Sequence, residues 1–179
     1  MADERTWINA SAPYMDPRPG RADAWTDEAA QRGHVGMQQL REVAEVEAPP
    51  EVAEAFDTPS GDAVVVRRRV VLLDGRPVEL VDSYYPSTVA RGTRIADPRK
   101  VPGGVVTLLA EMGYRPESIE EDVHARPAST QERQLLHLGE RDWVLVLARL
   151  LRTRGGMPYE MSVMTMSAYE RHLRYKIYS

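Results

Sequence analysis

Apolar residues recur at two different spacings along the chain, and each spacing predicts a different kind of element. Residues 64–73 and 78–85 are β-branched and apolar, and the strong turn signal Asp74-Gly75 joins them, which is typical of a β-hairpin. The same kind of pattern predicts further strands over residues 39–47, 118–125, 143–153 and 159–168. The tail RHLRYKIYS is expected to form a last strand or coil.

Helices are predicted where apolar residues recur every three or four positions. Asp23 is the expected N-cap of the first helix, and glycines 33, 113 and 139 are expected to end three of the helices. Residues 86–104 are rich in proline and glycine and are expected to form a loop or short helices. The predicted helices cover residues 23–33, 49–57, 105–114 and 130–139. Helices that intermix with short-turn hairpins predict an α+β domain, a mainly antiparallel sheet with flanking helices.

Composition narrows the class of protein. The 179 residues, 42% of them hydrophobic, suit a single domain, which we expect over residues 21–179 after a linker or N-terminal arm at 1–20. Cysteine is absent, which excludes disulfides and thiol chemistry. No apolar run approaches the roughly 20 residues of a membrane span, and the N-terminus lacks a signal-peptide core, so we expect a cytoplasmic protein without a membrane partner. The net charge of −4 argues against a free-standing nucleic-acid binder.

Three consecutive arginines interrupt the apolar strand at residues 67–69. Side chains alternate between the two faces of a strand, so Arg67 and Arg69 share one face and Arg68 takes the other. Burying a guanidinium without a partner costs several kcal/mol, so the shared face must be solvated, ion-paired or part of a polar cavity. Glu79 and Asp82 on the return strand are candidate partners. The residues alone leave two hypotheses open: a cross-strand salt-bridge ladder, or a pocket for an anionic or hydroxyl-rich ligand. Arg68 is assigned to an exposed edge or to a salt bridge with Asp82.

Other chemistry-bearing residues give weaker signals. No two of the four histidines stand at metal-ligand spacing, so we predict no metal site and no cofactor. His124 follows three acidic residues and is either an acid/base group or an ordinary exposed histidine. Gly103-Gly104 before a helix could present N–H groups to an anion, although a plain loop-to-helix junction is the better interpretation. Met164 and Met166 share one strand face, where they fill the core or line an adaptable apolar pocket.

Four segments, in order, resemble the UTRA effector-binding domain of GntR-type transcription regulators, HutC branch: RRRVVLLDGRPVELVDSYYP, PGGVVTLLAEMGY, EEDVHARPASTQERQLLHL and VLVLARLLRTRGGMPYEMSV. The resemblance covers roughly residues 40–179, and PRPGRADAWTDEAAQRG looks like the connector that follows the winged helix in that family. It implies a chorismate-lyase-like fold, a homodimer, and an effector that is a small anionic metabolite such as a sugar phosphate or a carboxylate.

The resemblance also implies a set of ligand-binding residues. The family positions that hold the effector on the sheet match Arg67, Arg69, Glu79, Arg149, Glu160 and Tyr175. For Arg149 the resemblance leaves a second role open, pairing with an acidic neighbour inside the sheet.

The sequence departs from the family pattern at its N-terminal end. Residues 1–60 show no helix-turn-helix layout, so DNA would be contacted only through a winged-helix domain absent from this chain. A sensor domain is therefore the first hypothesis. The alternative is a stand-alone enzyme or an accessory metabolite-binding protein, in which the arginine pair would hold a carboxylate and Glu79, Glu160 or His124 would move a proton.

Overall fold

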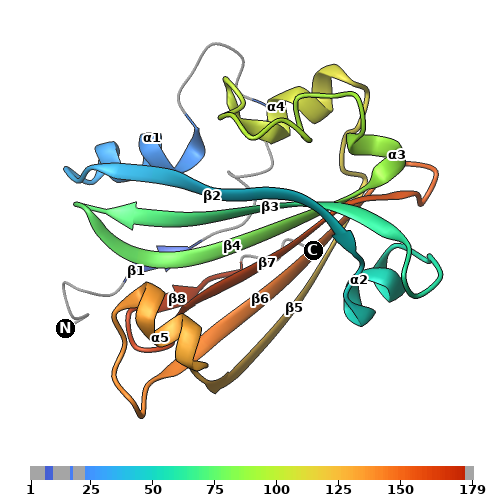
Figure 1. Ribbon diagram of the computed structural model, residues 1–179. Helices are drawn as coiled ribbons and strands as arrows, with labels where there is room; N and C mark the ends of the chain where they lie inside the picture. The colour runs from blue at the N-terminus through green and yellow to red at the C-terminus, as the bar shows by residue number, and fades with distance from the viewer. Residues whose placement is uncertain (1–6, 10–16, 18–22, 176–179) are drawn as a thin grey trace.

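The computed structural model describes residues 7–9, 17 and 23–175, and its main feature is a twisted six-stranded sheet (Figure 1). All neighbouring strands in this sheet are antiparallel. In spatial order the strands are β2 (Gly36–Glu47), β3 (Ala63–Leu73), β4 (Arg76–Pro86), β7 (Pro158–Ser167), β6 (Trp143–Arg152) and β5 (Ser118–Pro127). Both predicted hairpins and the predicted α+β class are confirmed.

Helices cover both faces of the sheet (Figure 1). On the face that carries Arg67, which we call the cavity face, lie α1 (Ala24–Gln31), α3 (Ser87–Ala90) and α4 (Gly104–Glu111). The opposite face packs against α2 (Pro50–Ala55) and α5 (Thr130–Leu136). Alternation along each strand therefore supplies a separate apolar cluster to each layer.

Local sequence explains where the helices begin and how close they pack. The Asp23 side chain accepts a hydrogen bond from Thr26 N and caps α1, as predicted. α1 packs tightly on β2 because Gly36 has no side chain, and a Cβ there would lie 2.7 Å from Cβ of Ala29. α5 begins with a capping box between Ser129 and Glu132.

The predicted end of the α5 helix at Gly139 was wrong. α5 ends at Leu136, and its C-cap is His137, which adopts a left-handed conformation with φ 56°. Histidine is among the non-glycine residues that tolerate this conformation.

The predicted N-terminal arm contains a strand. β1 (Trp7–Asn9) pairs in parallel with β8 (Arg171–Leu173), and Trp7 is buried against Trp25, with 5.0 Å between their ring centroids. Nε1 of Trp7 also donates to Oε1 of Glu28 at 3.0 Å. The other residues of the predicted arm, except Pro17, lie outside the described residues, as do residues 21–22 and the end of the tail at 176–179. Within the described part of the chain, no helix is long and apolar enough to cross a membrane.

Candidate functional site

A cavity of about 210 Å³, which we call the first cavity, lies between the cavity face of the sheet and the elements that cover it. Its walls include Trp25 of α1 and residues 100, 101 and 103–107, which run into the first turn of α4. Its apolar floor includes Val81, Leu147 and Met164. The polar side chains that line the floor include Arg67, Arg69, Glu79, Arg149, Glu160 and Ser162. Five of the six residues matched to the family's effector positions therefore meet in one place.

Strand register explains how the floor becomes polar. Residues directly opposite one another on neighbouring strands point to the same face. One continuous register row runs across five strands and is formed by Arg67, Ser83, Ser162, Arg149 and Glu121. The next row, which contains Arg69, continues through apolar residues. The floor of the cavity therefore consists of one row of polar side chains beside one row of apolar side chains.

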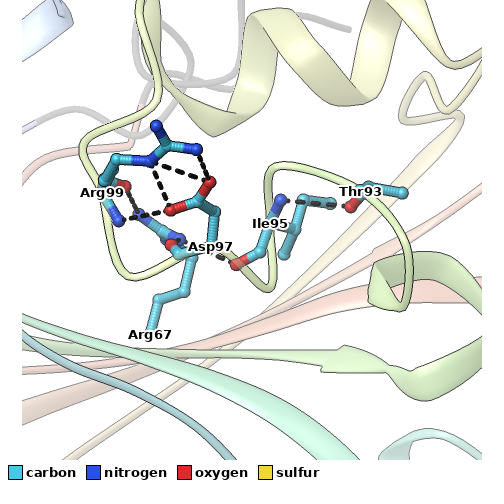
Figure 2. Close-up of polar contacts among 5 residues, drawn as sticks. All are labelled: Arg67, Thr93, Ile95, Asp97 and Arg99. Carbon is cyan, nitrogen blue, oxygen red and sulfur yellow. Dashed lines mark hydrogen bonds and ion pairs between the residues drawn. The ribbon is translucent and has the colours of Figure 1, made fainter.

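Arg67 is 3% exposed and holds the loop above it, as Figure 2 shows. Its Nη1 donates to the carbonyls of Ile95 at 2.7 Å and Asp97 at 2.8 Å, and its Nη2 donates to the carbonyl of Arg99 at 3.0 Å. Burial lowers the pKa of Arg67. The guanidinium therefore fastens residues 91–103, which we call the cover segment, over the sheet. Of its three nitrogens, only the buried Nε has no partner among the described residues.

Arg69 begins a chain of hydrogen bonds along the floor. Its Nη1 donates to Oε1 of Gln38 at 3.1 Å, and its Nη2 donates to Oγ of Ser83 at 2.8 Å. The Ser83 and Ser162 hydroxyls lie 2.7 Å apart, and Oγ of Ser162 donates to Oε1 of Glu160 at 2.9 Å. The chain orients Arg69 from both ends, so its guanidinium is fixed before any ligand arrives.

Two carboxyl groups are buried in the same cavity. Glu79 and Glu160 are each 8% exposed, and burial raises the pKa of both. The positive charge of Arg171 partly offsets the rise in the pKa of Glu79. A hydrogen bond from the Ser162 hydroxyl partly offsets the rise in the pKa of Glu160. Oε2 of Glu160 has no hydrogen-bond partner among the described residues. A buried carboxyl of this kind can offer a ligand either a donor or an acceptor.

Arg149 pairs with an acidic neighbour inside the sheet, which is the second of the two roles that the resemblance left open. Its Nε donates to Oε1 of Glu121 at 2.7 Å, and both side chains are 10% exposed. The pair lies in the polar register row, so Arg149 lines the cavity while its charge is balanced from within the sheet.

The structure leaves two expected residues outside the cavity. Tyr175 is 53% exposed and lies beside Glu121, and burial and that carboxylate raise its pKa to about 12. His124 pairs in register with Val146, whose side chain packs in the α5 cluster, so it points to the opposite face, where it is exposed. Neither residue is among those that line the first cavity.

Arg68 forms the salt bridge that the sequence suggested. It lies on the opposite face, where its Nε is 3.2 Å from Asp82 and its Nη1 is 2.7 Å from Glu42. Arg68 is therefore held by cross-strand salt bridges. The two arginines that flank it, Arg67 and Arg69, instead line a cavity.

Several residues that line the first cavity or support its floor were not singled out from the sequence. Gln38 and Lys100 come from segments with no recognisable motif, and Trp25 comes from the connector segment, to which no site role was assigned. Ser83 and Ser162 gave a usable signal, because each is a small polar residue in the middle of an otherwise apolar strand. Their significance depends on the pairing of β4 with β7, which the sequence does not reveal.

Comparison with known proteins identifies the class to which this covered α+β sheet belongs. The UTRA domain model matches residues 31–170, and the chain therefore belongs to the UTRA family, as predicted. An HTH-type transcriptional regulator of Streptomyces coelicolor is 35% identical over 138 residues, which are 75% of this chain and 51% of the relative. The chain spans about half the length of the relatives it matches.

Solved structures of regulators share the fold. The crystal structure of a GntR-family transcriptional regulator is similar with a TM-score of 0.82 and 25% identity, covering 97% of this chain and 70% of that one. The effector domain of PhnF from Mycobacterium smegmatis has a TM-score of 0.74 at 15% identity, covering 87% of this chain and 94% of that one. The second likeness supports the fold alone.

Proposed function

We propose that this chain is the effector-binding domain of a GntR-type transcription regulator of the HutC branch and that it senses a small anionic, hydroxyl-bearing metabolite. The observation that carries the proposal is that three residues lining the first cavity each have a buried polar side-chain atom without a partner among the described residues: Nε of Arg67, Nε of Arg69 and Oε2 of Glu160. Buried polar atoms normally have partners, so atoms left without one mark a place where a ligand is accommodated.

The two arginine Nε groups and Glu160 would bind different parts of the ligand. The Nε–H groups of Arg67 and Arg69 are charge-assisted donors suited to a carboxylate or phosphate oxygen. Glu160 suits a hydroxyl or amino group of the same ligand. Glu79 adds a second buried carboxyl at the other end of the floor. The ligand would lie beneath the cover segment, which Arg67 holds in place.

A sensor must couple binding to a change elsewhere in the molecule. That coupling requires the ligand to bind two conformations with different affinities. The cover segment and α1 both wall the cavity, and α1 packs through Trp25 on Trp7 of β1. A shift of α1 would therefore reach the N-terminal strand. We propose that DNA is contacted by a winged-helix domain outside these 179 residues and that the regulator is a cytoplasmic homodimer.

Isothermal titration calorimetry with a panel of anions tests the proposal. The panel contains inorganic phosphate, glucose 6-phosphate, glucosamine 6-phosphate, citrate and lactate. We expect at least one of them to bind the wild-type chain, and we expect Arg69→Met to weaken that binding at least about 10-fold through loss of the charge-assisted contact.

Arg68→Met is the matched control, because it removes the neighbouring arginine from the opposite face. It should bind like the wild type. No binding by any anion, or equal loss in both variants, would contradict the proposal.

A further inference from the structure

A second cavity, of about 230 Å³, opens beyond Glu160. It is lined largely by apolar and aromatic side chains, and it shares Val106 and Glu160 with the first cavity. Each cavity alone falls below the roughly 300–1,000 Å³ of typical small-molecule sites, whereas the two together fall within that range. The two cavities therefore adjoin at Val106 and Glu160, and a ligand that occupied both would fill a volume within that range.

An irregularity in β7 lies where the two cavities adjoin. Leu151 pairs with Glu160 and Arg152 pairs with Pro158, so Tyr159 is an extra, unpaired residue between them. A bulge of this kind redirects side chains, and bulges are frequent beside functional sites. Here it turns Tyr159 toward the cavity-face cluster, next to Glu160, instead of leaving the two on opposite faces.

Two tyrosines and several aliphatic side chains line the second cavity, together with Arg115 and the shared Glu160. The rings of Tyr114 and Tyr159 lie 5.6 Å apart with an interplanar angle of 34°, and Tyr159 is 1% exposed. Leu109 and Ala110 of α4 line the cavity opposite Leu151 of β6. Such a lining favours an apolar group about as large as an isobutyl or phenyl group.

Glu160 stands where the polar and apolar cavities meet. One of its oxygens receives the Ser162 hydroxyl, at the end of the chain of hydrogen bonds that begins at Arg69. The other oxygen is buried and has no partner among the described residues. A ligand that passes this point can satisfy that oxygen with a hydrogen-bond donor, which removes the free-energy cost of leaving a buried polar atom without a partner.

We infer that the effector is a two-part molecule. Its anionic end lies at the Nε atoms of Arg67 and Arg69, a hydroxyl or amino group contacts Oε2 of Glu160, and an apolar arm fills the second cavity. This inference rests on the proposed function, because it assumes that the first cavity binds the anionic end. It adds the chemical class of the remainder of the ligand.

Two pairs of anions, matched except for an aryl arm, test the inference by calorimetry. The pairs are lactate with 3-phenyllactate, and glucose 6-phosphate with phenyl β-glucoside 6-phosphate, which place the arm at different distances from the anion. In at least one pair we expect the aryl member to bind at least about 10-fold more tightly than its parent, because it buries a phenyl group.

Filling the second cavity should remove this gain. Ala110→Phe occupies the cavity from α4 and is expected to bind both members of a pair as the wild type binds the parent. Ala30→Phe, at an exposed position of α1, is the control and should keep the gain. Ala110→Leu provides a smaller filling group if the phenylalanine variant does not fold.

The outcomes separate the two claims. If a parent anion binds in an Arg69-dependent manner but neither aryl arm adds affinity, or if the gain survives in Ala110→Phe and Ala110→Leu, the inference of a two-part ligand is overturned and the proposed function stands. If no anion of either pair or of the earlier panel binds, the proposed function fails, and this inference fails with it.

Discussion

Three consecutive arginines in one strand have three different environments. Arg67 is buried and bonded to main-chain carbonyls, Arg68 is ion-paired on the opposite face, and Arg69 belongs to a hydrogen-bonded chain on the cavity floor. Strand alternation predicted the division between the faces. It could not predict that a loop about thirty residues away would occupy most of the donors of Arg67, because that contact depends on the path of the cover segment.

The loop-holding role of Arg67 predicts a large loss of stability in Arg67→Met. The substitution leaves three carbonyls of the cover segment without their donor, which should lower the free energy of unfolding by roughly 3 kcal/mol. Urea denaturation measures the loss, and hydrogen exchange should show faster exchange of the amides in residues 91–103. Arg68→Met removes two partly exposed ion pairs, to Glu42 and Asp82, and should cost only about 1 kcal/mol. Equal losses in the two variants would show that Arg67 does not hold the segment.

The buried carboxyl of Glu160 predicts a pH dependence of stability. Burial raises its pKa in the folded chain above the ordinary value of 4.5, so between the two values the folded chain binds more protons than the unfolded chain. Its contribution to stability is then complete below pH 4.5 and is lost as the pH rises through the folded-state pKa.

Glu160→Gln cannot ionise, so it should lack the loss of stability that the wild type shows as the pH rises, and it preserves the shape of the side chain. We expect the melting temperature of the variant to fall less than that of the wild type between acidic pH and pH 8, with Glu79 accounting for part of the residual slope. Thermal denaturation across this range, with the exposed Glu117→Gln as control, measures the difference. Parallel profiles in the wild type and Glu160→Gln would mean that Glu160 titrates in the folded chain as it does in the unfolded chain.

At the scale of elements, local signals were sufficient for most of the secondary structure. The turn at Asp74-Gly75, the cap at Asp23 and the prolines at the start of α2 act over a few residues, and the structure follows each of them. β1 escaped prediction because three residues carry no period, and its pairing partner, β8, lies at the other end of the chain. The capping box of α5 was also overlooked, although Ser129 and Glu132 stand at its characteristic spacing.

That capping box supports a prediction of its own. Glu132 accepts from Ser129 N at 2.8 Å and from both terminal nitrogens of Arg126 at 2.7 Å, and the Arg126 bonds lower its pKa to about 2. Glu132→Ala should lower the free energy of unfolding by about 1 kcal/mol at neutral pH. The difference from the wild type should shrink as the pH falls from 4.5 through about 2, because the wild-type carboxylate is then protonated.

Chemical denaturation between neutral pH and pH 2 measures this effect. Gln134→Ala, at an exposed position of the same helix, controls for the change in helix propensity. A loss in Glu132→Ala that stayed constant over the whole range would assign the effect to packing and not to charge.

At the scale of the whole molecule, the site depends on which strands are neighbours. The hairpins β3–β4 and β6–β7 could each be predicted from the sequence, but the cavity forms because β4 pairs with β7 and joins them. That pairing places Ser83 beside Ser162 and brings Arg69 and Glu160 onto one floor. The site residues proposed from family resemblance were therefore mostly brought together, while the hydrogen-bonded chain between them and the second cavity required the three-dimensional structure.

The most direct test of the account is to observe the arginine Nε–H groups themselves. Two-dimensional ¹H–¹⁵N NMR spectra of the arginine side chains, with the Arg69 resonance assigned by its absence in Arg69→Lys, would follow that group during titration with the anion panel. We predict that at least one anion shifts the Arg69 Nε–H resonance in a saturable manner and leaves that of Arg68 in place. If every anion left Arg69 unchanged, or moved Arg68 equally, the first cavity would not be an anion-binding site and the central claim would be wrong.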